Sequence, residues 1–294
     1  MTAEALQFLQ PERGGLFVDC TVGLGGHARA LLEAGATRLI GLDRDQDALA
    51  RARETLAPWA DRVDLVHSDY RSIADVLDAR RVIAIDGALA DLGVSSLQFD
   101  SPGRGFSFQR DEPLDMRMDV TAGETAADLV AQATEEELAN AIFMYGEERF
   151  SRRIARALVY ARREAPVDTT GRLAAIVRRA IPRRGAPARI DPATRTFQAL
   201  RIWVNRELDG LDGFLETVAR RLRAGARLVV ITFHSLEDRI VKHTLRALEN
   251  ATREGTTDVG IKVLTKRPLV PGDDEVRLNP RARSAKLRAA ERIA

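Results

Sequence analysis

The segment from Leu16 to Asp43 constrains the fold of this chain more than any other, because it has the pattern of a βαβ unit. A short apolar run leads into a turn that contains Gly23, Gly25 and Gly26, and a second apolar run ends at Asp43. Glycines in the first turn of such a unit bring backbone N–H groups and a helix N-terminus to one point. An acidic residue about 20 positions later suits a ribose diol. The segment therefore predicts a site for a nucleoside-containing ligand in an open α/β sheet.

Three interpretations of this turn are open on these residues alone. The spacing Gly23-x-Gly25-x-x-Ala28 fits the dinucleotide-binding fingerprint, which would place NAD here. A tight βα turn without any ligand would have the same composition. The third interpretation is favoured by Asp19 before the turn and His27 after it. Their acidic-then-glycine pattern resembles that of S-adenosylmethionine methyltransferases, and a bulky histidine crowds the place where a pyrophosphate needs a close approach.

The composition is that of an ordinary globular protein and excludes several classes. The 294 residues are enough for one large or two modest domains. No apolar run approaches about 18 residues and no signal peptide is recognised, so the protein is expected to be cytoplasmic and without a membrane span. The single cysteine, Cys20, excludes an internal disulfide framework, and the scattered histidines give no metal-binding spacing, so no metal is predicted.

Strand and helix patterns alternate up to Ser96, which predicts a doubly wound, Rossmann-like sheet. The segment Asp100–Asp119 has no usable periodicity and many turn formers, so it is predicted to be a long functional loop. Several segments of helical periodicity follow, and Thr134 with Glu137 has the spacing of a capping box. This part of the chain is expected to be an all-helical insert.

The sheet pattern resumes after the insert. The strand Ala226–Thr232 is followed by a polar loop and by the helix Arg239–Asn250, and the segment that begins at Asn279 is interpreted as a basic tail. The predicted core is therefore discontinuous, with residues 1–102 and 206–294 in the sheet domain and residues 103–205 in the inserted domain.

Polar groups follow five of the predicted strands. They are Asp19–His27, Asp43, Asp69–Tyr70, Asp91–Ser96 and His234–Asp238. Each has a structural interpretation, as a helix cap, a turn or a hydrogen-bonded loop histidine. Because an open α/β sheet binds its ligands outside the carboxyl ends of the strands, the convergence of all five favours a ligand site there.

Longer strings in the sequence are more specific than the glycine turn. They are Asp91–Ser96 (DLGVSS), Arg104–Phe108 (RGFSF), Pro113–Met118 (PLDMRM), Tyr145–Arg149 (YGEER), Pro192–Arg201 (PATRTFQALR), Phe233–Arg239 (FHSLEDR) and Asn279–Arg288 (NPRARSAKLR). In this order they extend over almost the whole chain, and they closely resemble the ribosomal RNA small subunit methyltransferase H family.

The resemblance implies a class I, S-adenosylmethionine-dependent methyltransferase fold with an inserted helical domain. It implies an enzyme that methylates the exocyclic N4 of one cytidine in the decoding centre, at the P site, of 16S ribosomal RNA. The expected partner is that RNA within the small ribosomal subunit or its late intermediate, and a homodimer is left open. A non-catalytic ribosome-assembly factor that retains a nucleoside pocket is the alternative from another class.

Site residues carried over from the family's motifs fall into two groups. The expected cofactor contacts are Gly25, Gly26, His27, Asp43, Tyr70, Asp91 and Gln98. For catalysis, Asp91 is expected to accept hydrogen bonds from the cytosine amine or to position the methionine end of the cofactor, since N4 gains positive charge as it reacts. His234 and Asp238 are second candidates for contact with the base or for proton removal.

The residues expected to bind RNA lie in the long loop and in the predicted tail. Phe106 and Phe108 are interpreted either as stacking platforms for a base or as residues that pack under the insert, with Arg104 beside them. The phosphate candidates are Arg281, Arg283, Lys286 and Arg288, because a basic tail has little core to serve.

Overall fold

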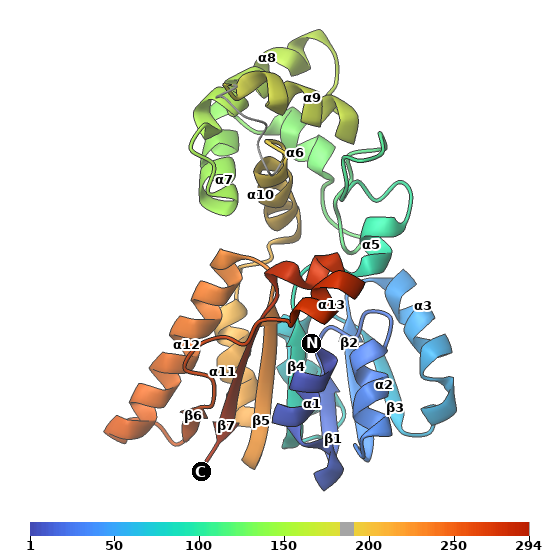
Figure 1. Ribbon diagram of the computed structural model, residues 1–294, viewed down its shortest axis with the longest axis vertical. Coiled ribbons are helices and arrows are strands. Elements are labelled where there is room, and N and C mark those ends of the chain that lie inside the picture. Colours follow the sequence, from blue (N-terminus) through green and yellow to red (C-terminus); the bar gives the residue numbers. More distant parts are fainter. Residues whose placement is uncertain (183–190, 294) are drawn as a thin grey trace. The chain divides into compact units, whose positions relative to one another are not determined.

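The computed structural model describes residues 1–182 and 191–293, and contacts divide the chain into two compact units. One unit comprises Met1–Gly93 and Leu208–Ala294, and the other comprises Val94–Glu207 (Figure 1). The first boundary falls earlier than residue 102, so Val94 to Pro102 group with the helical unit. The second falls two residues after the predicted one, at 207/208 instead of 205/206.

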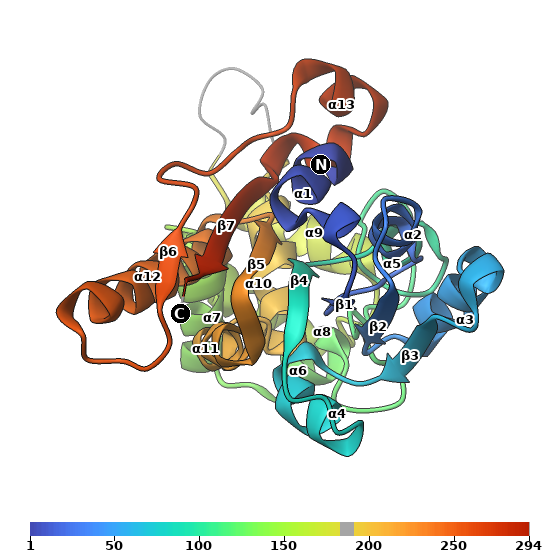
Figure 2. The same ribbon diagram turned by 90° about the horizontal axis from the view of Figure 1, so that it is seen from below.

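A seven-stranded sheet forms the centre of the first unit, in the order β3-β2-β1-β4-β5-β7-β6 (Figure 2). Its strands are β1 (Leu16–Asp19), β2 (Arg38–Asp43), β3 (Val63–His67), β4 (Ile85–Asp91), β5 (Leu222–Thr232), β6 (Ile261–Val263) and β7 (Lys286–Arg292). The pairs from β3 to β5 are parallel, and β7 runs antiparallel to both β5 and β6. The order is that of a dinucleotide-binding sheet, 3-2-1-4-5-6, with one antiparallel strand added between the last two.

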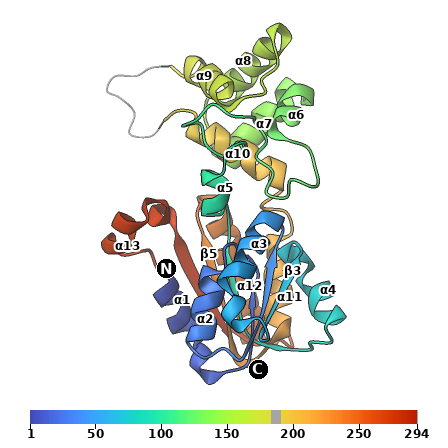
Figure 3. The ribbon, with the colours of Figure 1, turned by 90° about the vertical axis from the view of Figure 1, so that its right-hand side faces the viewer.

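Apolar side chains on both faces of this sheet are covered by helices (Figure 3). Successive residues of a strand point to opposite faces: Phe17 packs with the helices of one face and Val18 with those of the other. The helices of this unit are α1 (Thr2–Leu9), α2 (Gly26–Glu33), α3 (Gln46–Thr55), α4 (Ile73–Ala79), α11 (Leu211–Arg221), α12 (Ser235–Glu254) and α13 (Asp273–Leu278). The unit therefore has the three layers of a doubly wound fold, as predicted.

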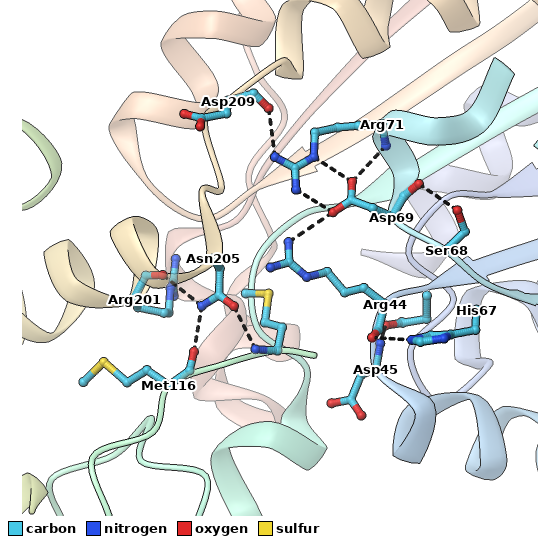
Figure 4. A network of polar contacts seen from close by, with 12 residues as sticks. Arg44, Asp45, His67, Ser68, Asp69, Arg71, Met116, Arg201, Asn205 and Asp209 are labelled. Atoms are coloured by element: carbon cyan, nitrogen blue, oxygen red, sulfur yellow. Dashed lines mark hydrogen bonds and ion pairs between the residues drawn. The ribbon is translucent and has the colours of Figure 1, made fainter. Parts of the chain in front are cut away.

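The second unit consists of helices around a core of its own. They are α5 (Ser96–Asp100), α6 (Ala126–Gln132), α7 (Glu135–Gly146), α8 (Ser151–Glu164), α9 (Thr170–Ala180) and α10 (Thr194–Asn205). The predicted capping box is present, since Glu137 N–H donates to Thr134 Oγ1 and the Glu137 carboxylate accepts from Thr134 N–H. The long loop is held by Asn205, which donates to Met116 O at 2.7 Å and accepts from Met118 N–H at 2.7 Å (Figure 4).

Two predicted elements were wrong. Helix α12 begins at Ser235 instead of Arg239, because the His234 side chain caps it, and histidine is not among the preferred N-cap residues. The segment from Asn279 is no tail: it contains a 3-10 turn, Pro280–Ser284, and then strand β7 inside the sheet. The sequence did not indicate that this strand is buried, because Arg288 lies in the middle of it and an arginine is almost never fully buried unless it is paired.

Candidate functional site

Three carboxylates lie at the carboxyl ends of neighbouring parallel strands. Asp19 ends β1, Asp43 ends β2 and Asp91 ends β4. The register pairs Asp19 with Gly41 on one side and with Leu89 on the other, so the three strands finish at one edge of the sheet. An open sheet binds its ligands at this edge, and here the edge is acidic.

The turn between β1 and α2 needs glycine for its own geometry at two positions. Gly25 N–H donates to Val22 O at 2.8 Å, and Val22 N–H donates to Leu42 O at 2.8 Å, which fixes the turn against β2. Gly23 has φ 51° and Gly25 has φ 83°, a region that favours glycine. A Cβ on Gly25 would also lie 3.2 Å from Leu56 Cγ.

Gly26, the first residue of α2, is different. Its φ is not positive, and a Cβ built there meets nothing within 4 Å among the described residues. The chain's own packing therefore does not require glycine at this position. The open space lies at a helix N-terminus, where the backbone N–H groups of the first turn have no intrahelical partner. This space can hold a ligand, and a larger side chain would reduce it.

Asp43 ties the glycine turn to the end of β2. Its Oδ2 accepts from Gly23 N–H at 2.8 Å, and its Oδ1 accepts from Asp45 N–H at 2.9 Å. Burial raises the pKa of Asp43, although these two hydrogen bonds act in the opposite direction. The carboxylate thus has a fixed orientation beside the turn, where a ribose anchor was predicted. Its contact with a ribose stays a prediction.

Asp91 combines one paired oxygen with one unpaired oxygen. His27 Nε2 lies 3.4 Å from Asp91 Oδ2, and Asp91 N–H donates to Thr21 Oγ1 at 2.7 Å. Asp91 Oδ1 is buried and has no hydrogen-bond partner among the described residues. A buried acceptor without a donor costs free energy, so this oxygen is positioned to accept a donor from a bound molecule. Sequence reasoning missed Thr21, whose only signal was its place directly before the glycine turn.

The electrostatics of this edge suit a cation. Burial raises the pKa of Asp19 to about 7, His27 opposes the shift, and Asp91 and Asp43 add to it. Burial alone would lower the pKa of His27, but its hydrogen bond to Asp91 and the charges of Asp91 and Asp19 outweigh burial and raise it. Asp19 was predicted only as part of the glycine motif. The structure shows that its carboxylate accepts from Thr21 N–H at 3.2 Å, inside the same cluster.

Asp69, after β3, holds two arginines (Figure 4). Its Oδ1 accepts from Arg71 N–H at 2.9 Å and from Arg71 Nε at 2.8 Å. Its Oδ2 accepts from Arg71 Nη2 at 2.6 Å and from Arg44 Nη1 at 3.3 Å. Because Arg44 directly follows Asp43, this clamp connects the loop after β2 with the loop after β3. The charges and hydrogen bonds of Arg71, together with Arg44, outweigh burial and lower the pKa of Asp69.

Tyr70 and Gln98, two predicted cofactor contacts, are both buried. Tyr70 is 9% exposed, and its ring packs edge-on against Phe214 with 4.7 Å between centroids. Gln98 belongs to the helical unit, where its Oε1 accepts from Ser95 N–H at 3.0 Å in the capping box of α5. The contacts of both residues with a cofactor stay predictions.

The two secondary catalytic candidates have structural roles in the first turn of α12. His234 caps the helix together with Glu237. Asp238 accepts from Arg288 Nε at 2.7 Å and lies 3.4 Å from Lys286 Nζ. Burial would raise the pKa of Asp238, but Arg288 and Lys286 outweigh it and lower the pKa. A carboxylate with a lowered pKa is a weak base, so these ion pairs argue against proton removal by Asp238.

The loop residues expected to stack on RNA are part of the core of the helical unit. Phe106 is 6% exposed and contacts Phe99 edge-on, and Phe108 packs on Phe197 with 4.8 Å between centroids. Arg104 is buried and donates to two backbone carbonyls of the loop. Burial contradicts RNA contact by Phe106 and Arg104, and Phe106 packs in the helical unit, as the alternative interpretation had it. Phe108 is half-buried, and its contact with RNA stays a prediction.

The basic C-terminal residues divide in the same way. Arg288 is 5% exposed and is paired with Asp238, and Lys286 is half-buried beside the same carboxylate. A buried, paired arginine cannot serve as a phosphate contact in a tail, so this prediction was wrong for Arg288. Arg281 and Arg283 are exposed in the 3-10 turn, and RNA binding by these two residues stays a prediction.

The residues at the acidic edge fit S-adenosylmethionine better than NAD. Adenosylmethionine has a ribose diol, an ammonium group and a sulfonium group, all of which favour carboxylates, and it has no phosphate. The edge offers Asp19, Asp43 and Asp91, a buried unpaired oxygen, and open space at Gly26. A pyrophosphate would meet like charge here. Fold and site together define a class I methyltransferase.

Comparison with known proteins gives the family. The model of the MraW methylase family matches residues 1–293. A ribosomal RNA small subunit methyltransferase H from Geotalea uraniireducens is 49% identical over 307 residues, covering 100% of this chain and 97% of the relative. Proteins of the same name from Bradyrhizobium diazoefficiens and Sorangium cellulosum are each 52% identical, covering 98% and 99% of this chain and 89% of each relative. The chain belongs to the MraW methylase family.

Family membership decides between the interpretations of the glycine turn. The chain is a methyltransferase, and its cofactor is S-adenosylmethionine and not NAD. Among the described residues, no helix is both long enough and apolar enough to cross a membrane.

Proposed function

We propose that this methyltransferase acts on 16S ribosomal RNA and methylates the exocyclic N4 of one cytidine in the decoding centre, at the P site. The names of the relatives support ribosomal RNA of the small subunit as the substrate class. The choice of N4 and of the P-site cytidine rests on the resemblance of the motifs from Asp91–Ser96 to Asn279–Arg288.

The chemistry requires an acceptor at the reacting amine. The N4 lone pair is delocalised into the cytosine ring, so N4 is a poor nucleophile and must be held in line with the methyl group. S-adenosylmethionine, when bound, supplies that methyl group in electrophilic form. As the N–C bond would form and the methyl–sulfur bond would break, with sulfur leaving as a neutral thioether, N4 gains positive charge and then loses a proton. A fixed acceptor beside N4 stabilises this charge.

Asp91 Oδ1 is the observation that carries the proposal. It is a buried carboxylate oxygen with no partner among the described residues, at the end of β4 and in the same cluster as His27. We assign to it the hydrogen bond from N4 and the acceptance of its proton. His27 and Thr21 act on Asp91, since one contacts the other oxygen and the other binds the backbone N–H. The target base has to enter this site unpaired or flipped out of its stack.

The remaining parts of the proposal concern the setting. We infer action in the cytoplasm on the small subunit or its late intermediate, where the decoding-centre RNA is folded but reachable. A homodimer stays a prediction, which light scattering of the purified protein would test.

Nucleoside mass spectrometry of 16S ribosomal RNA from a gene-deletion strain tests the proposal. N4-methylated cytidine at the P site should be absent from the deletion strain. It should return on expression of the wild type but remain at background with Asp91→Ala. An unchanged methyl pattern in the deletion strain would instead support the non-catalytic assembly factor.

A further inference from the structure

The arginines of the helical unit do not all serve the same purpose. Many are used by the unit itself: Arg162 donates to Val130 O and Ala133 O at the end of α6, and Arg178 forms a two-pronged ion pair with Asp191. The side chains of a second set make no hydrogen bond or ion pair with any residue that the structure describes. In helix α8 this set is Arg152, Arg153 and Arg163.

Helix α8 presents these arginines on one side together with a tyrosine. Arg152, Arg156, Tyr160 and Arg163 follow one another at intervals of four, four and three residues, which places them on one face of a helix. Arg153 borders this face, and all five side chains are exposed. We call these five residues the α8 face. The opposite side of α8 packs into the core of the unit, against α7 and α9 (Figure 1).

Folding does not explain the charge at this place. Arg152 and Arg153 lie in the first turn of α8, which has no acidic residue and no side-chain cap. Positive charge near a helix N-terminus is unfavourable because it adds to the positive end of the helix dipole. The first turn of α7 in the same unit has the stabilising arrangement, with a threonine cap and three glutamates.

The aromatic residue of the face is equally unexplained by packing. Tyr160 is 64% exposed, and its neighbours one turn away are Arg156 before it and Arg163 and Glu164 after it. Arg156 itself is 78% exposed and reaches Glu135 at 3.4 Å, a solvent-screened pair of little strength. Phe143 on α7 offers a contrast, since it is 60% exposed but lies on the side of its helix that bears Glu136, seven residues earlier.

We propose that the α8 face binds the phosphodiester backbone of the RNA, with one unpaired base stacked on Tyr160. The proposal rests on the proposed RNA substrate and names the surface that holds it. Arginine presents a planar fork that matches phosphate oxygens, and stacking on an aromatic ring tolerates any base. From Arg152 to Arg163 the helix rises about 16 Å, at about 1.5 Å per residue. That length spans more than one phosphate of a strand.

The test compares two pairs of matched variants. Arg152→Gln combined with Arg163→Gln removes two charges from the α8 face. Arg38→Gln combined with Arg53→Gln removes two from the sheet unit, where both side chains are exposed and have no hydrogen-bond or ion-pair partner among the described residues. Tyr160→Ser is matched by Phe143→Ser. Each variant is titrated with fluorescently labelled 16S ribosomal RNA transcribed in vitro, over a series of potassium chloride concentrations. Circular dichroism and calorimetry with adenosylmethionine report whether each variant is folded and binds its cofactor.

The α8 double variant should reduce the slope of log affinity against log salt by about 1.4, since each lost contact to single-stranded RNA contributes about 0.7. Tyr160→Ser should weaken binding roughly tenfold, a typical effect of losing one stacked base. In the Arg38/Arg53 control the slope should stay near the wild-type value. In Phe143→Ser the affinity for RNA should stay near the wild-type value. If each control variant changed RNA binding as much as its matched α8 variant, the proposal that the α8 face binds RNA would be overturned. An N4 methyl mark that persists in the gene-deletion strain would overturn the proposed function separately, because RNA affinity is measured here without methyl transfer.

Discussion

Single residues at the acidic edge show which features serve folding and which are left for a ligand. Gly25 has a positive φ and a side chain against it, so the fold requires glycine there. Gly26 has neither constraint. Asp43 has both carboxylate oxygens engaged by backbone N–H groups, whereas Asp91 has one buried oxygen without a partner among the described residues. At the acidic edge, the packing of the described residues therefore does not account for the glycine at position 26 or for the unpaired oxygen of Asp91.

Gly26→Ala should reduce cofactor affinity by at least about tenfold without harming the fold. The added methyl group occupies space that is open in the structure, and glycine to alanine in a helix raises stability by about 0.5–1 kcal/mol. Calorimetry with adenosylmethionine and thermal unfolding measure the two effects. Gly213→Ala in α11 is the control, because a Cβ there also meets nothing within 4 Å. Equal cofactor affinity in both variants would mean that the space at Gly26 is not the cofactor's.

Asp19→Asn should raise the free energy of unfolding, and more at pH 8 than at pH 5. The pKa of Asp19 is about 7 in the folded chain against an ordinary value of 3.8, so the folded state binds more protons between about pH 4 and pH 7. Its contribution to stability therefore falls as the pH rises through this window. At about 1.4 kcal/mol per pKa unit, the gain from the substitution should grow by on the order of 2–3 kcal/mol. Urea unfolding at the two pH values measures it, and a gain independent of pH would contradict the assignment.

At the scale of elements, ion pairs fix the loops and helices around the sheet. The Asp69 clamp joins the loop after β2 to the loop after β3, through Arg44 and Arg71. The pair of Asp238 and Arg288 joins the first turn of α12 to the middle of β7. The first lies beside Asp43, the predicted ribose anchor, and the second holds the last strand in place. Their loss should therefore have different consequences.

Asp69→Asn should raise the KM for adenosylmethionine several-fold and leave kcat nearly unchanged. Loss of the charge releases Arg44 and Arg71, which loosens Asp43 and Tyr70 without touching the reacting groups. Steady-state kinetics with saturating RNA measures both constants. Asp64→Asn is the control. Asp64 lies near the start of β3, away from the carboxyl end of that strand, and its substitution breaks an ion pair with Arg80. A fall in kcat at constant KM would rule out this positioning role.

Arg288→Ala should lower the free energy of unfolding toward the lower end of about 3–5 kcal/mol, because it leaves a buried carboxylate with only Lys286 beside it. The deficit should shrink below about pH 4. Asp238 has a lowered folded pKa, so its contribution is present above its unfolded value of 3.8 and is lost as the pH falls. Chemical denaturation measures both effects. Arg277→Ala removes an exposed pair with Asp274 and should cost under about 1 kcal/mol. If both variants lost the same free energy of unfolding, the burial of the Arg288 ion pair would make no difference to its contribution to stability.

At the scale of the whole molecule, local patterns predicted most of the fold. The glycine turn, the alternation of strands and helices and the Thr134 capping box each have a short-range signal, and each is present in the structure. Strand β7 has no such signal, because its burial depends on a partner, Asp238, that lies far away in sequence. The start of α12 was missed for a related reason, since a histidine caps it.

The candidate site was predictable to a similar degree. Asp43 and Asp91 lie at strand ends, and Gly26 and His27 begin the helix that follows β1. A doubly wound topology brings these places together, so their convergence follows from the order of elements. Exposure does not follow from that order. Phe106 has an aromatic side chain of the kind that stacks on bases, but it lies in the core of the helical unit. The exposed arginines of α8 can be told apart from the arginines that form hydrogen bonds and ion pairs within the helical unit only when the orientation and burial of α8 are known.

Transfer of a labelled methyl group tests the central claim most directly. Small ribosomal subunits from a gene-deletion strain are incubated with the purified protein and adenosylmethionine that carries a deuterated methyl group, and fragments of the 16S ribosomal RNA are sequenced by mass spectrometry. The result predicted is one deuterated methyl group, on N4 of a P-site cytidine, with the wild type and background labelling with Asp91→Ala. Label on another atom or base, or an unlabelled 16S ribosomal RNA with the wild type, would contradict the account.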